Sequence, residues 1–110
     1  MNPLTVRQLD TTTGPVLYVA GDLDFDRAPV LRSRLDQLPL SRGQCLVLDL
    51  SGLAFCDSEG ITALLAARQH ALAAGADIAL AAVPANLLRV LTLVGLDQVF
   101  TLRPDSSAAS

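Results

Sequence analysis

The sequence predicts a single α/β domain, with a mixed sheet of four to five strands and with helices packed mainly on one face. Strand-like and helix-like segments alternate from the second segment onward, which favours parallel strands joined by right-handed crossovers. Residues 45–50 (CLVLDL) are apolar except at Asp49, as expected for a central, covered strand. A chain of 110 residues with a hydrophobic fraction of 51% is long enough for one core and too short for two domains.

The first two segments predict a β-hairpin. Residues 4–9 form a strand-like run, residues 10–14 (DTTTG) are a turn cluster, and residues 15–20 (PVLYVA) form a second strand. The segment 21–24 (GDLD) ends this second strand, and Gly21 is expected to supply a tight backbone turn there.

A first helix is expected after the hairpin, with Asp26 as its N-cap. The helix is predicted to continue to about Leu38, because Pro39 cannot extend it. Its apolar side chains recur at helical spacing and form one stripe, which consists of Val30, Leu31, Leu35 and Leu38.

A second helix is predicted over residues 58–74, and Gly75 is a suitable residue to stop it. His70 lies off the apolar side of this helix, so we expect it to be exposed. The apolar stripe of the helix is expected to consist of Ile61, Leu64, Leu65 and Leu72.

The C-terminal third of the sequence completes the predicted sheet. Residues 78–83 form a strand, residues 85–94 form a third helix that the preceding proline opens, and residues 98–102 form a short last strand. The domain is therefore expected to span residues 1–102. Residues 103–110 are small and polar, and we expect them to be a disordered tail.

Composition and charge exclude several classes of function. The formal net charge is −3, and the eight basic residues are scattered arginines, so we expect no nucleic-acid partner. No apolar run approaches the roughly 18 residues of a membrane span, and the N-terminal stretch lacks a signal-peptide pattern, so the protein is expected to be cytoplasmic with no membrane partner. Cys45 and Cys56 are too far apart for a CxxC site, and the sequence predicts no metal site and no cofactor.

The segment 57–60 (DSEG) opens the second predicted helix shortly after a strand. A helix N-terminus carries unpaired N–H groups and a partial positive charge, so it can hold a phosphate, either on a ligand or on the serine itself. Two structural alternatives stay open at this point: Ser58 could serve only as the N-cap, or Asp57 could be the cap and leave the Ser58 hydroxyl free.

Asp22 and Asp24 follow the second predicted strand, and the carboxyl ends of parallel strands meet at one edge of a sheet. These two residues could be solvated loop carboxylates, loop caps or contacts to a partner. Paired carboxylates also suit acid–base catalysis or a hard metal ion, but no third ligand follows at a matching spacing. A small hydrolase or phosphate-binding enzyme would need a positioned base, a lysine or a glycine-rich phosphate loop, and the sequence has none of these. We therefore expect that the protein is not an enzyme.

Three motifs at matching separations make the chain similar to the STAS family, whose fold is that of bacterial anti-sigma factor antagonists. The first is Gly21-Asp22-Leu23-Asp24, followed by a helix with Ala28, Pro29 and Leu31. The second is Asp49, then Leu53 and Phe55, then Asp57-Ser58-x-Gly60. The third is the C-terminal run Val90-Leu91-Thr92-Leu93-Val94-Gly95-Leu96, closed by Val99-Phe100.

The resemblance implies a function that depends on protein partners. In such antagonists the serine after the aspartate is phosphorylated by a cognate anti-sigma factor that is also a serine kinase, so Ser58 is the implied phosphoacceptor. The unphosphorylated antagonist binds the anti-sigma factor and frees a sigma factor, and a serine phosphatase resets it. The implied partner-binding residues are Asp22, Asp24, Asp57, Ser58, Glu59, Gly60, Ile61 and Leu93.

Two features of the sequence modify this expectation. Glu59 occupies a position that is usually Ser, Thr or Ala in the family, and its charge could slow or restrict phosphorylation of Ser58. It therefore gives weight to an alternative, a STAS binding module that is never phosphorylated, such as a transporter-ATPase subunit or a signalling scaffold. The third predicted helix is apolar almost all round apart from Arg89, so it is either deeply buried or a surface for a partner or a weak homodimer.

Overall fold

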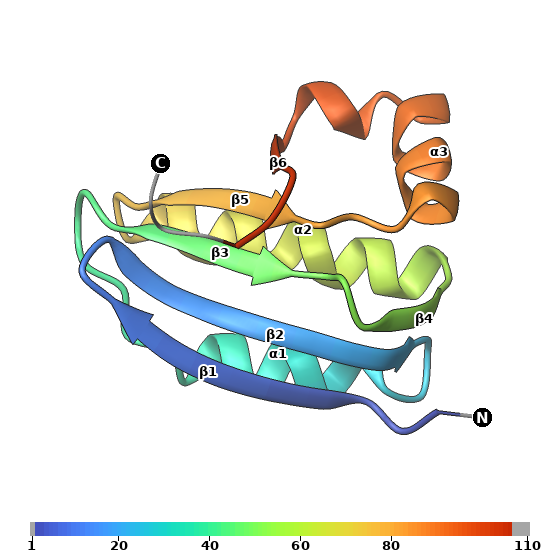
Figure 1. Cartoon of the computed structure of the whole chain (residues 1–110). Coiled ribbons are helices and arrows are strands. Elements are labelled where there is room, and N and C mark those ends of the chain that lie inside the picture. The colour runs from blue at the N-terminus through green and yellow to red at the C-terminus, as the bar shows by residue number, and fades with distance from the viewer. Residues whose placement is uncertain (1, 107–110) are drawn as a thin grey trace.

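The computed structural model describes residues 2–106, and these form a mixed sheet with six strands. The strand order is β1-β2-β3-β5-β6, and β4 pairs with the end of β2 instead of joining this path (Figure 1). The first pair is antiparallel and every other pair is parallel, so the predicted mixed α/β sheet is confirmed. The strands are β1 (Thr5–Thr11), β2 (Gly14–Leu23), β3 (Cys45–Asp49), β4 (Leu53–Cys56), β5 (Asp77–Ala81) and β6 (Thr101–Arg103).

Two helices, α1 (Ala28–Asp36) and α2 (Ser58–Ala73), pack side by side on one face of the sheet (Figure 1). A third helix, α3 (Ala85–Leu93), and a short 3-10 helix, η1 (Leu96–Gln98), connect β5 to β6 at the edge of the molecule. The prediction that helices cover mainly one face is confirmed. Because β2, β3 and β5 are parallel, their carboxyl ends lie at the same end of the domain as β4 and the start of α2 (Figure 1).

The main core is aliphatic and lies between the sheet and the two packed helices. Its contribution from α2 differs from the predicted stripe: Leu64 is fully buried, but Leu72 is 46% exposed. The buried face of the helix is made largely of small residues, because these let the helix lie close to the strands. These residues are Gly60, Ala63, Leu64, Ala67 and Ala71.

His70 is half-buried, so its predicted exposure is wrong. Its Nε2 atom lies 2.9 Å from the carbonyl oxygen of Leu38, in the segment that follows α1. The residue is off the apolar face of α2 but points toward the neighbouring helix, whose chain end needs a hydrogen-bonding partner.

The start of α1 also differs from the prediction. The N-cap position is Arg27, which makes no side-chain capping hydrogen bond, and the predicted cap Asp26 is exposed. Asp24 takes the capping role instead: its Oδ1 accepts a hydrogen bond from the Arg27 amide at 3.0 Å, and its carbonyl oxygen accepts one from the Ala28 amide at 2.7 Å. The helix ends at Asp36, two residues before the predicted end at Leu38.

Strand β4, which lies between β3 and the start of α2, is not predicted from the sequence. The turn between β3 and β4 is short. Asp49 Oδ1 holds it together by accepting hydrogen bonds from the Ser51 amide at 3.0 Å and from the Ser51 hydroxyl at 2.6 Å. Burial by itself would raise the pKa of Asp49, but hydrogen bonds from Ser51 and Ser106 outweigh burial and hold the pKa below its usual range. The chain can therefore turn at once into β4, which pairs with the end of β2 across a register shift at Gly21 and Asp22.

The last strand is shifted relative to its predicted position at residues 98–102. Gln98 ends η1, while Arg103 belongs to β6 and its carbonyl oxygen accepts a hydrogen bond from the Ala82 amide at 3.0 Å. Residues 107–110 of the predicted tail lie outside the described residues, so that prediction and the domain boundary at residue 102 stay predictions. Within residues 2–106, no helix is both long and apolar enough to cross a membrane.

Candidate functional site at the start of α2

Asp57 is the N-cap of α2, and this settles the choice that the sequence left open. Its backbone is extended, and its Oδ1 accepts hydrogen bonds from the amides of Glu59 at 3.0 Å and Gly60 at 3.1 Å. Two of the unpaired N–H groups at the helix start are thereby satisfied by one carboxylate oxygen. Ser58 is consequently the first helical residue and is not the cap.

The Ser58 side chain is exposed, and its hydroxyl is available for chemistry. Among residues 2–106, none forms a hydrogen bond with Ser58 Oγ; the Thr62 hydroxyl binds only the Ser58 backbone carbonyl, at 3.0 Å. A hydroxyl in the first turn of a 16-residue helix lies in the positive end of the helix dipole, where a phosphate is electrostatically favoured.

The loop after β2 is tied directly to this helix start. The second carboxylate oxygen of Asp57, Oδ2, accepts a hydrogen bond from the Phe25 amide at 3.3 Å, and the Asp57 amide donates to the Leu23 carbonyl at the same distance. Two segments that are far apart in the sequence, residues 21–25 and 56–60, therefore form one surface. This is the meeting of strand ends that the predicted parallel sheet required.

Asp22 and Asp24 both serve as loop caps, one of the alternatives that the sequence allowed. Asp22 Oδ2 accepts a hydrogen bond from the Asn2 amide at 3.1 Å, and Asp24 forms an ion pair with Arg27 at 2.8 Å. Each aspartate is only half-buried, so each also presents negative charge to solvent beside α2. These structural roles leave their predicted part in partner binding as a proposal.

The four remaining predicted site residues differ in exposure and in location. Glu59 is exposed next to Ser58, while Gly60 is buried against β2 and β4. Ile61 is half-buried and packs against the main core, so little of it can reach a partner. Leu93 is 79% exposed, but it lies on α3 and not in the segments that surround Ser58.

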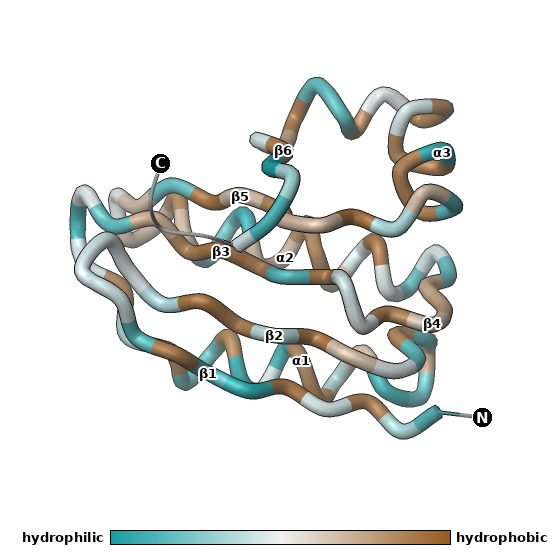
Figure 2. The backbone as a smooth tube through the Cα atoms, viewed as in Figure 1, coloured by the Kyte–Doolittle hydropathy of each residue, from teal (hydrophilic) through white to brown (hydrophobic). Residues whose placement is uncertain are grey.

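The surface of α3 carries exposed apolar side chains, as its sequence indicated. Leu87 and Leu91 are buried on its inner side, whereas Val90, Leu93 and Val94 are 39%, 79% and 60% exposed. Figure 2 shows hydrophobic stretches of α3, interrupted by hydrophilic ones, at the edge of the domain. The structure therefore favours an exposed apolar surface over deep burial of α3.

Two aromatic residues beside Ser58 were missed as site residues by the sequence analysis. Phe25, in the loop after β2, is 69% exposed, and Phe55, in β4, is 51% exposed. Phe55 is paired with Asp22 in the β2–β4 register. The sequence signal that could have identified them is their position next to the two acidic motifs. Only 4% of the residues in this chain are aromatic, so two aromatic residues near these motifs are notable.

Removal of the Asp57 carboxylate is expected to destabilise the domain. We expect Asp57→Ala to cost about 1–2 kcal/mol in the free energy of unfolding, because the amides of Glu59 and Gly60 lose their acceptor. Urea denaturation followed by circular dichroism measures this cost. The matched control is Asp26→Ala, which removes an exposed aspartate that caps nothing and should change stability by less than about 0.5 kcal/mol. Equal effects of the two substitutions would contradict the assignment of the cap.

Cys56 is expected to be an unreactive thiol. Burial, together with the negative charge of Asp57, raises its pKa from 9.0 to about 11. Near pH 8 the folded protein should therefore contain about 100-fold less Cys56 thiolate than an unfolded chain, since each pKa unit is a factor of ten. Alkylation by iodoacetamide, followed by mass spectrometry with and without denaturant, measures this difference. Alkylation of Cys56 at the same rate in both states would contradict it.

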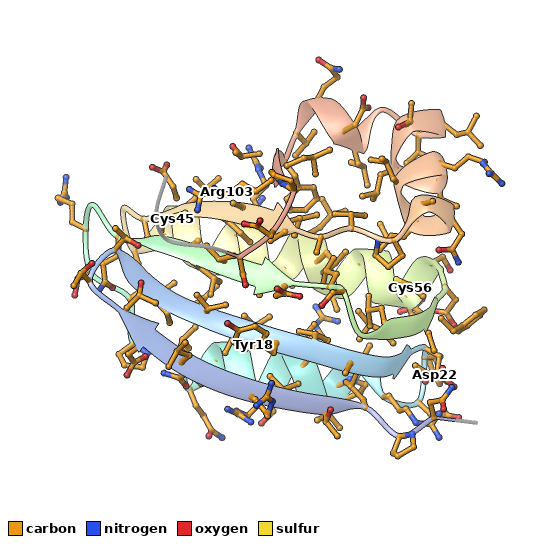
Figure 3. The ribbon with its side chains drawn as sticks, in the orientation of Figure 1. Tyr18, Asp22, Cys45, Cys56 and Arg103 are labelled. Atoms are coloured by element: carbon orange, nitrogen blue, oxygen red, sulfur yellow. The ribbon has the colours of Figure 1, made fainter. Side chains whose placement is uncertain are left out.

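No cluster of three or more His, Cys, Asp or Glu side chains within residues 2–106 is placed to hold a metal ion. The labelled side chains in Figure 3 also show that Cys45 and Cys56 lie at opposite ends of the domain. The site around Ser58 is thus a surface of carboxylates, one free hydroxyl and two exposed aromatic residues. Such a surface suits contact with another protein.

Comparison with known proteins supports the predicted family. Residues 7–104 match the family model described as "Mlab, STAS domain". A crystal structure of an anti-sigma factor antagonist from Mycobacterium paratuberculosis is 29% identical, with a TM-score of 0.77, and the match covers 94% of this chain and 87% of that one.

Two more distant structures share the fold. The phosphorylated form of the Bacillus cell fate determinant SpoIIAA is 16% identical, with a TM-score of 0.67 and coverage of 96% of this chain and 92% of that one. A sulfate transporter family protein from Wolinella succinogenes is 18% identical, with a TM-score of 0.71 and coverage of 83% and 76%. Because the matched family model spans almost all of the described residues, the chain belongs to the STAS domain family.

Proposed function

We propose that this protein is an anti-sigma factor antagonist that is switched off by phosphorylation of Ser58. The unphosphorylated chain binds an anti-sigma factor that is also a serine kinase, and this binding releases a sigma factor for transcription. A serine phosphatase restores the active form. The observation that carries the proposal is the exposed Ser58 hydroxyl, which no group among residues 2–106 engages and which lies at a helix N-terminus.

The chemistry of the switch belongs to the partner. Ser58 Oγ forms a bond to the γ-phosphorus of ATP, the bond from that phosphorus to ADP breaks, and the serine proton passes to a base of the kinase. Within residues 2–106 no histidine lies at the site, because His70 is three turns away along α2 and its Nε2 contacts the Leu38 carbonyl. ATP and Mg²⁺ therefore come with the kinase, and the antagonist is a substrate and a ligand, and not an enzyme.

Electrostatics explain how one phosphate could end binding without changing the fold. Phosphoserine adds roughly −1.5 to −2 charges near neutral pH. The positive end of the α2 dipole favours this charge, so the domain keeps its structure. A partner packed against the same spot would have to bury the charge beside Asp22, Asp24 and Glu59, and that is unfavourable.

The proposal is tested by phosphate transfer between purified proteins. The chain is incubated with Mg²⁺, ATP and each candidate anti-sigma factor kinase of its own genome, and intact-protein mass spectrometry records the gain of one phosphate. Ser58→Ala should abolish the gain, whereas Ser33→Ala, which removes an exposed serine of α1, should leave it unchanged. Phosphate on another residue, or on none with any kinase, would overturn the proposal.

Glu59 is expected to slow the transfer. Its carboxylate is exposed in the first turn of α2, next to Ser58, and it repels both the incoming γ-phosphate and the added phosphoryl group. We expect Glu59→Ala to raise the initial rate of Ser58 phosphorylation by about threefold to tenfold, as removal of about 1 kcal/mol of repulsion predicts. Glu59→Gln, which keeps the side-chain shape, should act in the same direction. A rate that neither substitution changes would contradict this role.

A second function is a STAS binding module that is never phosphorylated, such as a subunit of a transporter ATPase. The specific observation in its favour is Glu59, because a carboxylate beside Ser58 already gives the site part of the charge of a phosphorylated form. The fold similarity to a sulfate transporter family protein is compatible with this alternative. The phosphate-transfer experiment separates the two functions, and the localisation in either case is proposed to be cytoplasmic.

A further inference from the structure

The aromatic residues of this chain are distributed unevenly. The sequence contains three phenylalanines, one tyrosine and no tryptophan. Phe100 is 4% exposed and belongs to the core, whereas Phe25 and Phe55 are 69% and 51% exposed. A large aromatic side chain stabilises a fold only when it is buried, so these two exposed rings contribute little to stability.

Both exposed phenylalanines are held at the start of α2. The Phe25 amide donates a hydrogen bond to Asp57 Oδ2 at 3.3 Å, which fixes its backbone against the N-cap. Phe55 lies three residues before Ser58 in β4, where it pairs with Asp22 of β2. The two phenylalanines therefore come from two separate segments whose backbones meet at the start of α2.

The segments that carry the two phenylalanines are predominantly acidic. Asp22, Asp24, Asp26, Asp57 and Glu59 all lie in the segments that carry the two phenylalanines or the start of α2. In these segments, residues 21–27 and 53–60, the only basic residue is Arg27, and its guanidinium is already paired with Asp24 at 2.8 Å. An acidic surface of this kind repels nucleic acids and anionic lipid headgroups, and it attracts a protein surface that carries arginine or lysine.

We propose that Phe25 and Phe55 are the principal apolar anchors of the partner-binding surface, and that the partner is a protein with an apolar pocket bordered by basic side chains. This inference rests on the proposed function, because it specifies the partner of the same site. Exposed aromatic side chains that become fully desolvated are the residues that dominate binding energy at protein interfaces. Acidic side chains around them provide orientation and a fast association rate.

The same arrangement makes the switch sensitive to a single phosphate. Two anchored rings exclude water from the space around Ser58, so a phosphoryl group there cannot remain solvated in the complex. The free-energy penalty for burying the phosphoryl group increases as the two rings exclude water more completely. The phenylalanines thus supply affinity to the unphosphorylated form and raise the cost of binding for the phosphorylated form.

The apolar surface of α3 is the competing site for this partner. Val90, Leu93 and Val94 are also exposed, but they lie at α3, whose one charged residue is the basic Arg89. A basic partner that recognises the acidic side chains near Ser58 would contact the phenylalanines and not α3. Leu93 was predicted to bind the partner, so it provides a direct comparison.

The experiment measures the dissociation constant, by isothermal titration calorimetry without ATP, for each candidate anti-sigma factor kinase of the same genome. Phe25→Ala and Phe55→Ala are each expected to weaken binding about 30-fold, and Phe25→Leu to weaken it less. Leu9→Ala is the control: Leu9 is 53% exposed, and it pairs with Val16 at the opposite end of β2. The Leu9→Ala variant should bind with the wild-type Kd. Thermal denaturation should show that every variant is folded like the wild type.

Each result supports or overturns the proposal. Weaker binding of both phenylalanine variants, together with a Kd that rises with salt concentration, supports it. Wild-type affinity in both variants, with a loss in Leu93→Ala, overturns it and assigns the partner to α3. If Ser58 accepts no phosphate but the phenylalanine variants lose affinity, the proposed switch fails and this surface stands. If no kinase of the set binds the wild type, both proposals fail.

Discussion

Phosphorylation of Ser58 is expected to weaken binding to the anti-sigma factor by about 100-fold or more. A dianionic group would be buried among carboxylates, with the Asp57 side chain already occupied by the amides of Glu59, Gly60 and Phe25. Leaving a charge unpaired in a protein interface costs about 2–5 kcal/mol, which corresponds to a factor of roughly 30 to several thousand in the dissociation constant.

This loss of affinity can be measured with two matched proteins. The Ser58-phosphorylated chain and the unphosphorylated chain are titrated against the same anti-sigma factor in a buffer without ATP. Ser58→Glu should reproduce part of the loss, and Ser33→Glu, which adds a charge on the exposed side of α1, should reproduce almost none. Equal affinities of the phosphorylated and unphosphorylated chains would show that Ser58 lies outside the interface.

Substitution of Gly60 by alanine is expected to destabilise the domain by about 2–3 kcal/mol. Helix propensity alone predicts the opposite, a gain of about 1 kcal/mol. However, a Cβ atom at this position would overlap the Leu23 carbonyl oxygen and lie 2.6 Å from Cys56 Sγ. Backbone atoms of β2 cannot move aside without breaking the contact between that strand and α2, so overpacking outweighs propensity.

Denaturant unfolding of Gly60→Ala measures this balance directly. The comparison variant is Glu59→Ala, one residue earlier in the same turn, because its side chain is exposed and its removal creates no overlap. We expect the Glu59 variant to stay within about 0.5 kcal/mol of the wild type. A Gly60→Ala protein that is as stable as the wild type, or more stable, would show that the close approach of α2 to β2 is not required.

The parts of the fold that were predicted correctly depend on local periodicity. Alternation of apolar strands with helices indicated the parallel sheet, and the single antiparallel hairpin followed from the DTTTG turn at residues 10–14. The helix start at Ser58 followed from its sequence too. Asp57 and Ser58 are both good capping residues, so the choice between them required the observed geometry.

The errors arise where long-range contacts decide the structure. Strand β4 is only four residues long, and it forms because Asp49 and Ser51 tighten the preceding turn. The capping acceptor at the start of α1 is Asp24 instead of Asp26, and a local sequence pattern does not distinguish these two aspartates of one loop. The buried face of α2 is rich in alanine, which has too little apolar surface to dominate a periodicity pattern.

The distinction between local sequence patterns and long-range contacts also applies to the candidate site. The acidic residues and Ser58 were found from the sequence because their motifs are local. The exposure of Phe25 and Phe55 could not be found in this way, since a phenylalanine in a strand or after a strand is usually buried. Phe25 also lies beside Asp57 only through a hydrogen bond between residues 32 positions apart, which the sequence did not reveal.

The most direct test of the proposed function is displacement of the sigma factor. The purified complex of a sigma factor with its anti-sigma factor is titrated with the unphosphorylated chain and, separately, with the Ser58-phosphorylated chain, and free sigma factor is measured by analytical gel filtration. We predict stoichiometric release by the unphosphorylated chain and none by the phosphorylated chain at the same concentration. Equal release by both forms, or no release by either form from any sigma complex of the genome, would contradict the proposed antagonist function.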